Sequence, residues 1–137
     1  DNFKQINDLY GHSAGDDVLV KMSTLLRSYF RSDDIVARFG GDEFIVFVPC
    51  VKDKRVVLAK ADLIIEAVRD EISARYNMAQ VSTSIGIAYS DMGSSVSSIF
   101  EQADKALYEA KQNGKDRCCV ANSHSRLKQS VRETVKI

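Results

Sequence analysis

The sequence has no tryptophan, one proline and three cysteines among its 137 residues. An odd cysteine count, with Cys118 beside Cys119, argues against a disulfide framework and favours a reducing compartment. Two histidines and these cysteines also provide too few ligands at suitable spacing for zinc. The longest apolar run, residues 44–51, is far shorter than the roughly 20 residues of a membrane span. We therefore expect a cytoplasmic domain without a membrane segment, although a parent protein could be anchored through other regions.

The charges of the chain give no sign of a nucleic-acid or membrane partner. Nineteen basic and nineteen acidic residues cancel, which argues against a nucleic-acid-binding or membrane-surface protein. Apolar residues make up 45% and charged residues 28% of the chain, as in ordinary globular proteins. The length fits one domain with its own core. Because Asp1 is followed at once by a structured pattern, we expect the chain to be a piece of a longer protein.

Helical and strand patterns alternate along the chain. Apolar residues at three- and four-residue spacing predict helices, and short β-branched runs predict strands. Such an alternation, with one hairpin, predicts an α+β sandwich in which helices cover a mixed sheet. The last segment, 122–137, places Leu127, Val131 and Val135 four apart among charges and predicts a linker helix. The predicted helices are 3–10, 16–30, 52–76 and 99–112, and the predicted strands are 35–39, 44–48, 81–89 and 117–120.

A hairpin with an acidic tip lies near the middle of the chain. Gly40 and Gly41 can both adopt positive φ, as a tight two-residue turn requires. Asp42 and Glu43 follow, where a buried strand leaves the turn. Adjacent carboxylates repel each other and lose hydration there, so a hard divalent cation that also binds phosphate oxygens would stabilise them. The alternative is a solvated hairpin tip, because glycines and acids are common in turns.

Several motifs, in this order and spacing, resemble the GGDEF family of diguanylate cyclases over about residues 1–120. The resemblance implies a palm-like, ferredoxin-like fold of about five strands. It also implies that two GTP molecules, one per subunit of a homodimer, condense to cyclic di-GMP, a bacterial second messenger. The motifs are Asp-x-Phe-Lys-x-Ile-Asn-Asp at 1–8, Gly-His-x-x-Gly-Asp at 11–16, Arg-x-Gly-Gly-Asp-Glu-Phe at 38–44, Ser-Ile-Gly-Ile-Ala at 84–88 and Ala-Asp-Lys-Ala-Leu-Tyr-x-Ala-Lys-x-x-Gly-Lys at 103–115.

The resemblance assigns the chemistry to the acidic pair. Asp42 matches the position that binds the metal pair and is the expected base for the attacking 3′-hydroxyl, and Glu43 is its neighbour at the metal. The expected cofactor is Mg²⁺ or Mn²⁺, which would lower the pKa of the hydroxyl and neutralise phosphate charge.

The same resemblance assigns a GTP site. Asn7 and Asp16 match the guanine-reading positions, and an amide and a carboxylate suit the donors and acceptors of guanine. Without the resemblance, Asn7 would be taken as a turn residue and Asp16 as a helix cap. Lys111 and Lys115, four apart at a helix end, match residues that reach the triphosphate, although cations there also complement a helix dipole. The remaining substrate-binding residues are Phe3, Lys4, Gly40 and Gly41.

Arg31 and Asp34 match the family's Arg-x-x-Asp product-inhibition site. Arginine can donate two hydrogen bonds to a guanine edge or phosphate, and the aspartate can accept from guanine N–H groups. The alternative is a polar turn that ends a helix with a local ion pair.

The chain also departs from the family pattern. The family's first strand, which is central in the sheet, carries a metal-binding aspartate two residues before Asp1, and this sequence does not include it. We therefore expect 1–121 to be an N-terminally truncated GGDEF domain with a gap in its sheet and little or no activity. Residues 126–132 resemble the lead-in to an EAL-type phosphodiesterase domain, so 122–137 is expected to be a linker toward such a domain, in a parent that also has a sensory domain.

Two further functions remain open. One is a catalytically inactive regulatory module that binds GTP or cyclic di-GMP. The other, an unrelated nucleotidyl cyclase or polymerase palm, is disfavoured by the guanine-reading positions.

Overall fold

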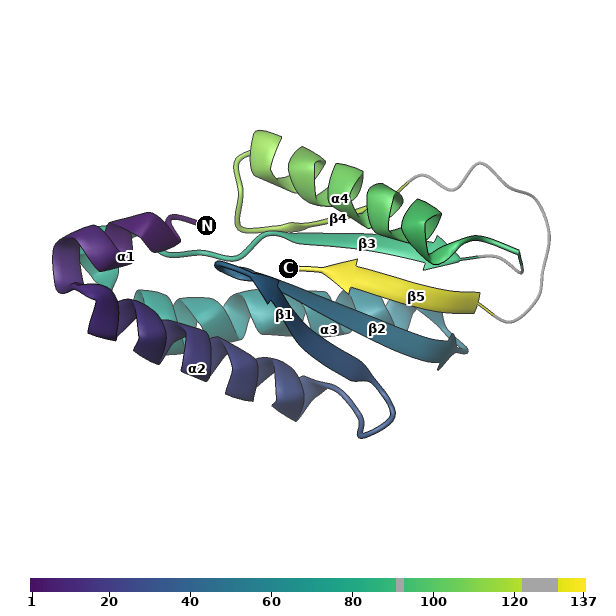
Figure 1. The fold of residues 1–137 in the computed structure, drawn as a ribbon, viewed down its shortest axis with the longest axis horizontal. Helices are drawn as coiled ribbons and strands as arrows, with labels where there is room; N and C mark the ends of the chain where they lie inside the picture. Colours follow the sequence, from purple (N-terminus) through teal and green to yellow (C-terminus); the bar gives the residue numbers. More distant parts are fainter. Residues whose placement is uncertain (91–92, 122–130) are drawn as a thin grey trace.

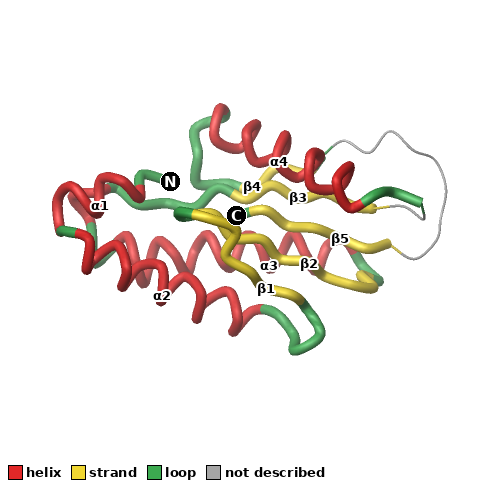
Figure 2. The backbone as a smooth tube through the Cα atoms, in the orientation of Figure 1, coloured by secondary structure: helices red, strands yellow, loops and turns green. Residues whose placement is uncertain are grey.

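The computed structural model describes residues 1–90, 93–121 and 131–137, and Figures 1 and 2 show how their elements are arranged. A π-helical turn, Arg69–Ser73, and a short 3₁₀ turn, Asn77–Ala79, follow the third helix. None of the helices in the described ranges is long and apolar enough to cross a membrane. The helices and strands are α1 (Phe3–Tyr10), α2 (His12–Tyr29), β1 (Ile35–Gly40), β2 (Glu43–Val51), α3 (Lys54–Val68), β3 (Ile85–Ser90), α4 (Val96–Gln112), β4 (Cys118–Val120) and β5 (Val131–Lys136).

The strands form one mixed sheet in the order β1-β2-β5-β3-β4. Only β3 and β4 pair in parallel, and the other neighbours are antiparallel. Helices α2 and α3 lie on one face of the sheet and α4 lies on the other (Figure 1). The predicted mixed sheet covered by helices is confirmed.

The main core lies between the sheet and the α2–α3 layer. Alternation along β2 turns Phe44 and Val46 into this core, with 3% and 0% of their surface exposed. A smaller cluster of Ala88, Ile99 and Ala103 lies between β3 and α4. The sheet and α4 approach closely at Gly86, where a Cβ would overlap the Ala103 carbonyl oxygen and the Leu107 amide nitrogen. The close backbone approach that a glycine inside a strand indicates is therefore present.

The prediction of a helix over 122–137 is wrong for its last part, because Val131–Lys136 is strand β5. The predicted position of Leu127 lies outside the described residues. Strand β5 pairs antiparallel with β2 on one side and β3 on the other, and it buries Val135 in the main core. The expectation of an open gap in the sheet is also wrong. A strand placed there satisfies backbone groups on two neighbours at once, which a helix packed outside could not do.

Several local boundaries also differ from the prediction: β3 begins at Ile85 rather than Val81, and α3 ends at Val68. Helix α2 begins at His12, directly after Gly11, whereas the prediction began the helix at Asp16. In the hairpin, Gly40 still pairs with Glu43, so the turn consists of Gly41 and Asp42 rather than the two glycines. A shift in register between Arg38 and Gly40 moves the turn by one residue, and only Gly41 of the glycine pair has positive φ, at 53°.

Candidate functional site

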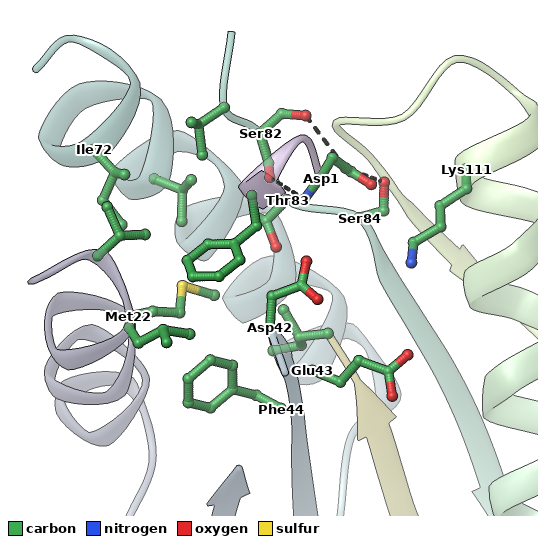
Figure 3. A pocket seen from close by; sticks show the side chains of 16 residues that line it. Asp1, Met22, Asp42, Glu43, Phe44, Ile72, Ser82, Thr83, Ser84 and Lys111 are labelled. Carbon is green, nitrogen blue, oxygen red and sulfur yellow. Dashed lines mark hydrogen bonds between the residues drawn. The ribbon is translucent and has the colours of Figure 1, made fainter. Parts of the chain in front are cut away.

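The acidic pair lies at the turn between β1 and β2. Arg38 Nε donates to the Gly41 carbonyl oxygen at 2.8 Å and closes the turn. Asp42 stands exposed at the tip, and Glu43 is half-buried as the first residue of β2. In Figure 3 the two carboxylates point in different directions, with Asp42 toward Thr83 and Glu43 toward the side of α4. The adjacent acids therefore face two different neighbours.

A small cavity of about 60 Å³ lies beside this turn. Asp42, Glu43 and Lys111 contribute to its lining, as does Phe3 from the start of α1. Figure 3 shows the Lys111 side chain directed from α4 into the same pocket. Hence predicted metal-binding, phosphate-binding and loop residues from three separate parts of the chain meet at one place.

Asp1 was given no role by the sequence, yet it fixes the loop before α1. Its carboxylate accepts hydrogen bonds from Ser84 Oγ at 2.7 Å and from Ser82 Oγ at 3.2 Å. These contacts hold the start of α1, with Phe3 and Lys4, against the segment that leads into β3. The Ser-x-Ser pattern before a strand was the available signal, because hydroxyls at alternate positions point to the same side.

The two predicted guanine-reading residues lie on neighbouring helices. Asn7 is in α1, and a Cβ at Gly15 of α2 would overlap Asn7 Oδ1, so the glycine permits this approach. Asp16 follows Gly15 and is exposed. Because α2 begins at His12, Asp16 is not the N-cap of the helix, and that alternative is excluded. The structure therefore places the Asn7 amide against the turn of α2 that carries Asp16.

Lys115 also reaches the loop before α1. After α4, Gly114 adopts a φ of 107°, and the Lys115 amide donates to the Ala110 carbonyl oxygen at 3.0 Å, which ends the helix. Lys115 Nζ donates to Asn2 Oδ1 at 3.0 Å, and Asn2 Nδ2 donates to the Gln80 carbonyl oxygen at 3.0 Å. Lys111 and Lys115 thus both face the start of α1, as the prediction of a shared ligand requires.

A third cation, Lys136 of β5, was missed by the sequence analysis. Its side chain is 6% exposed, and its Nζ lies 2.6 Å from Asp104 Oδ1 and 3.8 Å from Glu43 Oε1. The ammonium also lies 4.9 Å from the Phe100 ring centroid and 5.9 Å from that of Phe39. The β-branched residues of Val131–Ile137 were the available signal, since they favour a strand over the predicted helix.

The described residues do not fit a bound pair of divalent cations in this arrangement. Mg²⁺ prefers several oxygen ligands, and the turn offers the carboxylates of Asp42 and Glu43. Across the described ranges no group of three or more His, Cys, Asp or Glu side chains is placed to hold a metal. Glu43, moreover, already has the ammonium of Lys136 beside it.

Arg31 and Asp34 lie in the turn after α2, at a distance from the acidic hairpin tip along β1. Asp34 is buried, and its Oδ2 accepts from the Arg31 amide at 2.8 Å, so the carboxylate has a local structural partner. Both residues line a cavity of about 240 Å³, together with Lys52 and Lys60. The two predicted residues therefore share a basic pocket, and Asp34 also stabilises the turn itself.

The structure thus has an open mixed sheet with an acidic turn at one end, and Lys111 and Lys136 are directed toward that turn. A family profile described as "Diguanylate cyclase, GGDEF domain" matches residues 1–117. The solved GGDEF domain of DgcB from Caulobacter crescentus, in complex with c-di-GMP, superimposes with a TM-score of 0.79 at 31% identity, over 90% of this chain and 74% of that one.

Two curated relatives agree with this match. Diguanylate cyclase A of Treponema denticola is 40% identical over 127 residues, which are 90% of this chain and 34% of that protein. MucR of Pseudomonas aeruginosa, a bifunctional diguanylate cyclase/cyclic di-GMP phosphodiesterase, is 32% identical over 90% of this chain and 18% of its own length. The chain thus spans about a third or less of these relatives. It belongs to the GGDEF domain family of diguanylate cyclases.

Proposed function

We propose that this chain is the GGDEF domain of a protein that condenses two GTP molecules to cyclic di-GMP and releases two pyrophosphates. In each half-reaction the 3′-oxygen of one GTP forms a bond to the α-phosphorus of the other, and the bond from that phosphorus to the pyrophosphate breaks. Asp42, exposed at the tip of the turn, accepts the hydroxyl proton. The observation that best supports this proposal is that one pocket is lined by Asp42, Glu43, Phe3 and Lys111.

The substrate is held by residues of this pocket and by residues around it. Asn7 and Asp16 read the guanine from the α1–α2 corner, where Gly15 brings the two helices close. The backbone of Phe3 and Lys4 approaches the phosphates, as do Gly40 at the end of β1 and Gly41 in the turn. Lys111 and Lys115 neutralise the triphosphate from the end of α4, since cations stabilise charge that spreads over phosphate oxygens.

Mg²⁺ or Mn²⁺ is the proposed cofactor, with Asp42 and Glu43 as its ligands once Glu43 is free of Lys136. A homodimer is the proposed active form, because each subunit presents one set of these residues and the reaction joins two GTP molecules. The pocket is partly open to solvent, and we propose that GTP lies across its open side.

The test is a comparison of Asp42→Asn with Asp70→Asn, an exposed acid on the π-helical turn. Loss of a general base typically costs two to four orders of magnitude in rate, so we expect at least about a 100-fold loss of product for Asp42→Asn. The folded state should be unchanged, because Asp42 is exposed at the tip of the turn. Turnover by Asp42→Asn at the rate of Asp70→Asn would remove Asp42 from the chemistry.

Guanine recognition is tested separately from catalysis. Asn7→Ala should weaken the preference for GTP over ATP by about 10-fold or more, because a hydrogen bond to the base is lost. The control is Asn77→Ala, at the 3₁₀ turn. Equal preference in the two variants would assign Asn7 to helix packing alone.

We further propose that Arg31 and Asp34 bind cyclic di-GMP as an inhibitory product. The basic cavity that they share with Lys52 and Lys60 supports this proposal, since those cations suit phosphate. Arg31→Ala should relieve inhibition by added cyclic di-GMP, whereas Arg55→Ala, in a local pair with Asp53, should not. Unchanged inhibition in Arg31→Ala would leave the turn a structural feature.

The second candidate function is a module that binds GTP or cyclic di-GMP without catalysis. The ion pair of Glu43 with Lys136 favours it, because an acid beside an ammonium binds a metal less tightly than a free one. GTP bound but not converted would identify this function.

The whole protein, we propose, is cytoplasmic around this domain and carries a sensory domain. A phosphodiesterase half is also proposed, in line with the bifunctional relative.

A further inference from the structure

We propose that Lys136 and a divalent cation compete for Glu43, so that strand β5 lowers the metal affinity of the acidic turn. The inference rests on the proposed function of Asp42 and Glu43 as metal ligands. It assigns a role to a residue outside the family motifs, near the end of the described chain.

The backbone of β5 fixes where Lys136 can lie. In the sheet register Lys136 stands opposite Ile45 on one side and Gly86 on the other. The next residue, Ile137, exchanges two hydrogen bonds with Phe44, of 2.9 Å and 3.0 Å. Figure 1 shows this end of β5 at the same end of the sheet as the turn between β1 and β2. Lys136 is therefore held directly beside the residues that follow the turn.

The surroundings of Lys136 compensate the charge of its ammonium group. The side chain is 6% exposed, and a buried ammonium is costly unless carboxylates compensate it. Asp104 of α4 supplies one, at 2.6 Å, and Glu43 supplies the other, at 3.8 Å. The rings of Phe39 and Phe100, in contact with each other at 5.2 Å between centroids, also attract the cation.

The competition follows from the position of this charge. A metal ion bound to Glu43 would lie within a few ångströms of the ammonium, and two cations at that separation repel strongly in a half-buried site. Either Lys136 withdraws from Glu43 toward Asp104, or the metal binds weakly. Asp104 is the closer partner and lies on a different element, so Glu43 can be released without leaving the ammonium unpaired.

The test is a titration of the 137-residue chain with Mn²⁺, with the free ion measured by electron paramagnetic resonance. Lys136→Met removes the charge and keeps an unbranched side chain. This variant should bind Mn²⁺ at least about tenfold more tightly, because a unit charge a few ångströms from the metal changes its affinity by more than a factor of ten. Lys136→Arg should stay near the wild-type affinity. Lys54→Met makes the same change at a lysine that lies over the Tyr89 ring, near the far end of β2, and should have no effect.

Glu43 provides the matched control. In a Glu43→Gln background, Lys136→Met should change Mn²⁺ affinity less than twofold, since the shared ligand is gone. Circular dichroism establishes that each variant is folded, and Lys136→Gln replaces Lys136→Met if the latter is not. Equal Mn²⁺ affinity in the wild type and the neutral variants would overturn the inference, as would a gain in Mn²⁺ affinity that persists in the Glu43→Gln background. Absence of cyclase turnover would not overturn it, because Mn²⁺ binding is measured independently of turnover.

Discussion

Single residues outside the site connect its helices, and Tyr76 is the clearest of them. Its hydroxyl donates to Asp17 Oδ2 at 2.9 Å and ties the turn after the π-helical segment to α2. This hydrogen bond, with Lys21 and Arg75 nearby, holds the pKa of Asp17 below its ordinary 3.8. A lowered pKa in the folded state gives stability that is present above pH 3.8 and lost as the pH falls through the folded value.

Tyr76→Phe should therefore lower the melting temperature at pH 7 by about 4 °C, the usual consequence of losing one hydrogen bond in a domain of this size. The difference in melting temperature between Tyr76→Phe and the wild type should shrink below about pH 4, where Asp17 is protonated in the unfolded chain. Thermal unfolding followed by circular dichroism measures both. Tyr108→Phe, at an exposed tyrosine, is the control. The same loss at pH 3 as at pH 7 would show that packing, and not the Asp17 charge, carries the effect.

Among elements, α4 depends on β3 for its position, and it carries Lys111 and Asp104 toward the site. The contact is close because Gly86 has no side chain, so the helix backbone lies almost against the strand. Since Ala103 and Leu107 belong to α4, a shift of the helix there would also move both charged residues.

Gly86→Ala should lower the free energy of unfolding by about 2–3 kcal/mol, the cost of overpacking against backbone that cannot move. Gly40→Ala is the matched control for stability, because a Cβ there meets nothing within 4 Å. Urea unfolding measures the difference. Equal stability of the two variants would mean that α4 is not packed on β3 as described.

The elements also show why part of the fold could be predicted and part could not. The periodicity of Leu19, Met22 and Leu26 fits only a helix, so α2 was found. Its start was missed because the small and polar residues 12–15 carry no apolar periodicity. Val131 and Val135, four apart, share one face in a helix and also in a strand. Their spacing therefore could not distinguish a helix from β5. The β-branched residues favour a strand, and pairing with β2 and β3 completes it.

The residues of the site also divide into those that the sequence identifies and one that depends on strand order. Asp42, Glu43 and Lys111 lie in motifs whose order along the chain identifies them, and the structure brings them to one pocket. Lys136 meets Glu43 only because β5 enters between β2 and β3. A contact that depends on strand order across the sheet has no local signature in the sequence.

In the molecule as a whole, β5 joins two halves of the sheet. Without it, the β1–β2 hairpin and the β3–β4 pair share no backbone hydrogen bonds in the described residues, because β5 is the only strand between them there. The acidic turn belongs to one half, whereas Lys111 is on a helix packed against the other. The geometry of the site is therefore a property of the complete sheet.

Amide hydrogen exchange tests directly whether β5 pairs within the sheet. The Ile137 amide, which donates to the Phe44 carbonyl oxygen at 3.0 Å, should exchange about as slowly as core amides that open only on global unfolding. The Asp42 amide at the exposed turn tip should exchange rapidly. An Ile137 amide as unprotected as that of Asp42 would mean that β5 is not part of the sheet in solution.

The most direct measurement of the central claim is the conversion of GTP by the 137-residue chain, with products resolved by chromatography over a range of Mn²⁺ concentrations. We predict slow formation of cyclic di-GMP that rises with Mn²⁺ and disappears in Asp42→Asn. GTP that binds but stays unconverted at every Mn²⁺ concentration would contradict the account and identify the chain as a binding module.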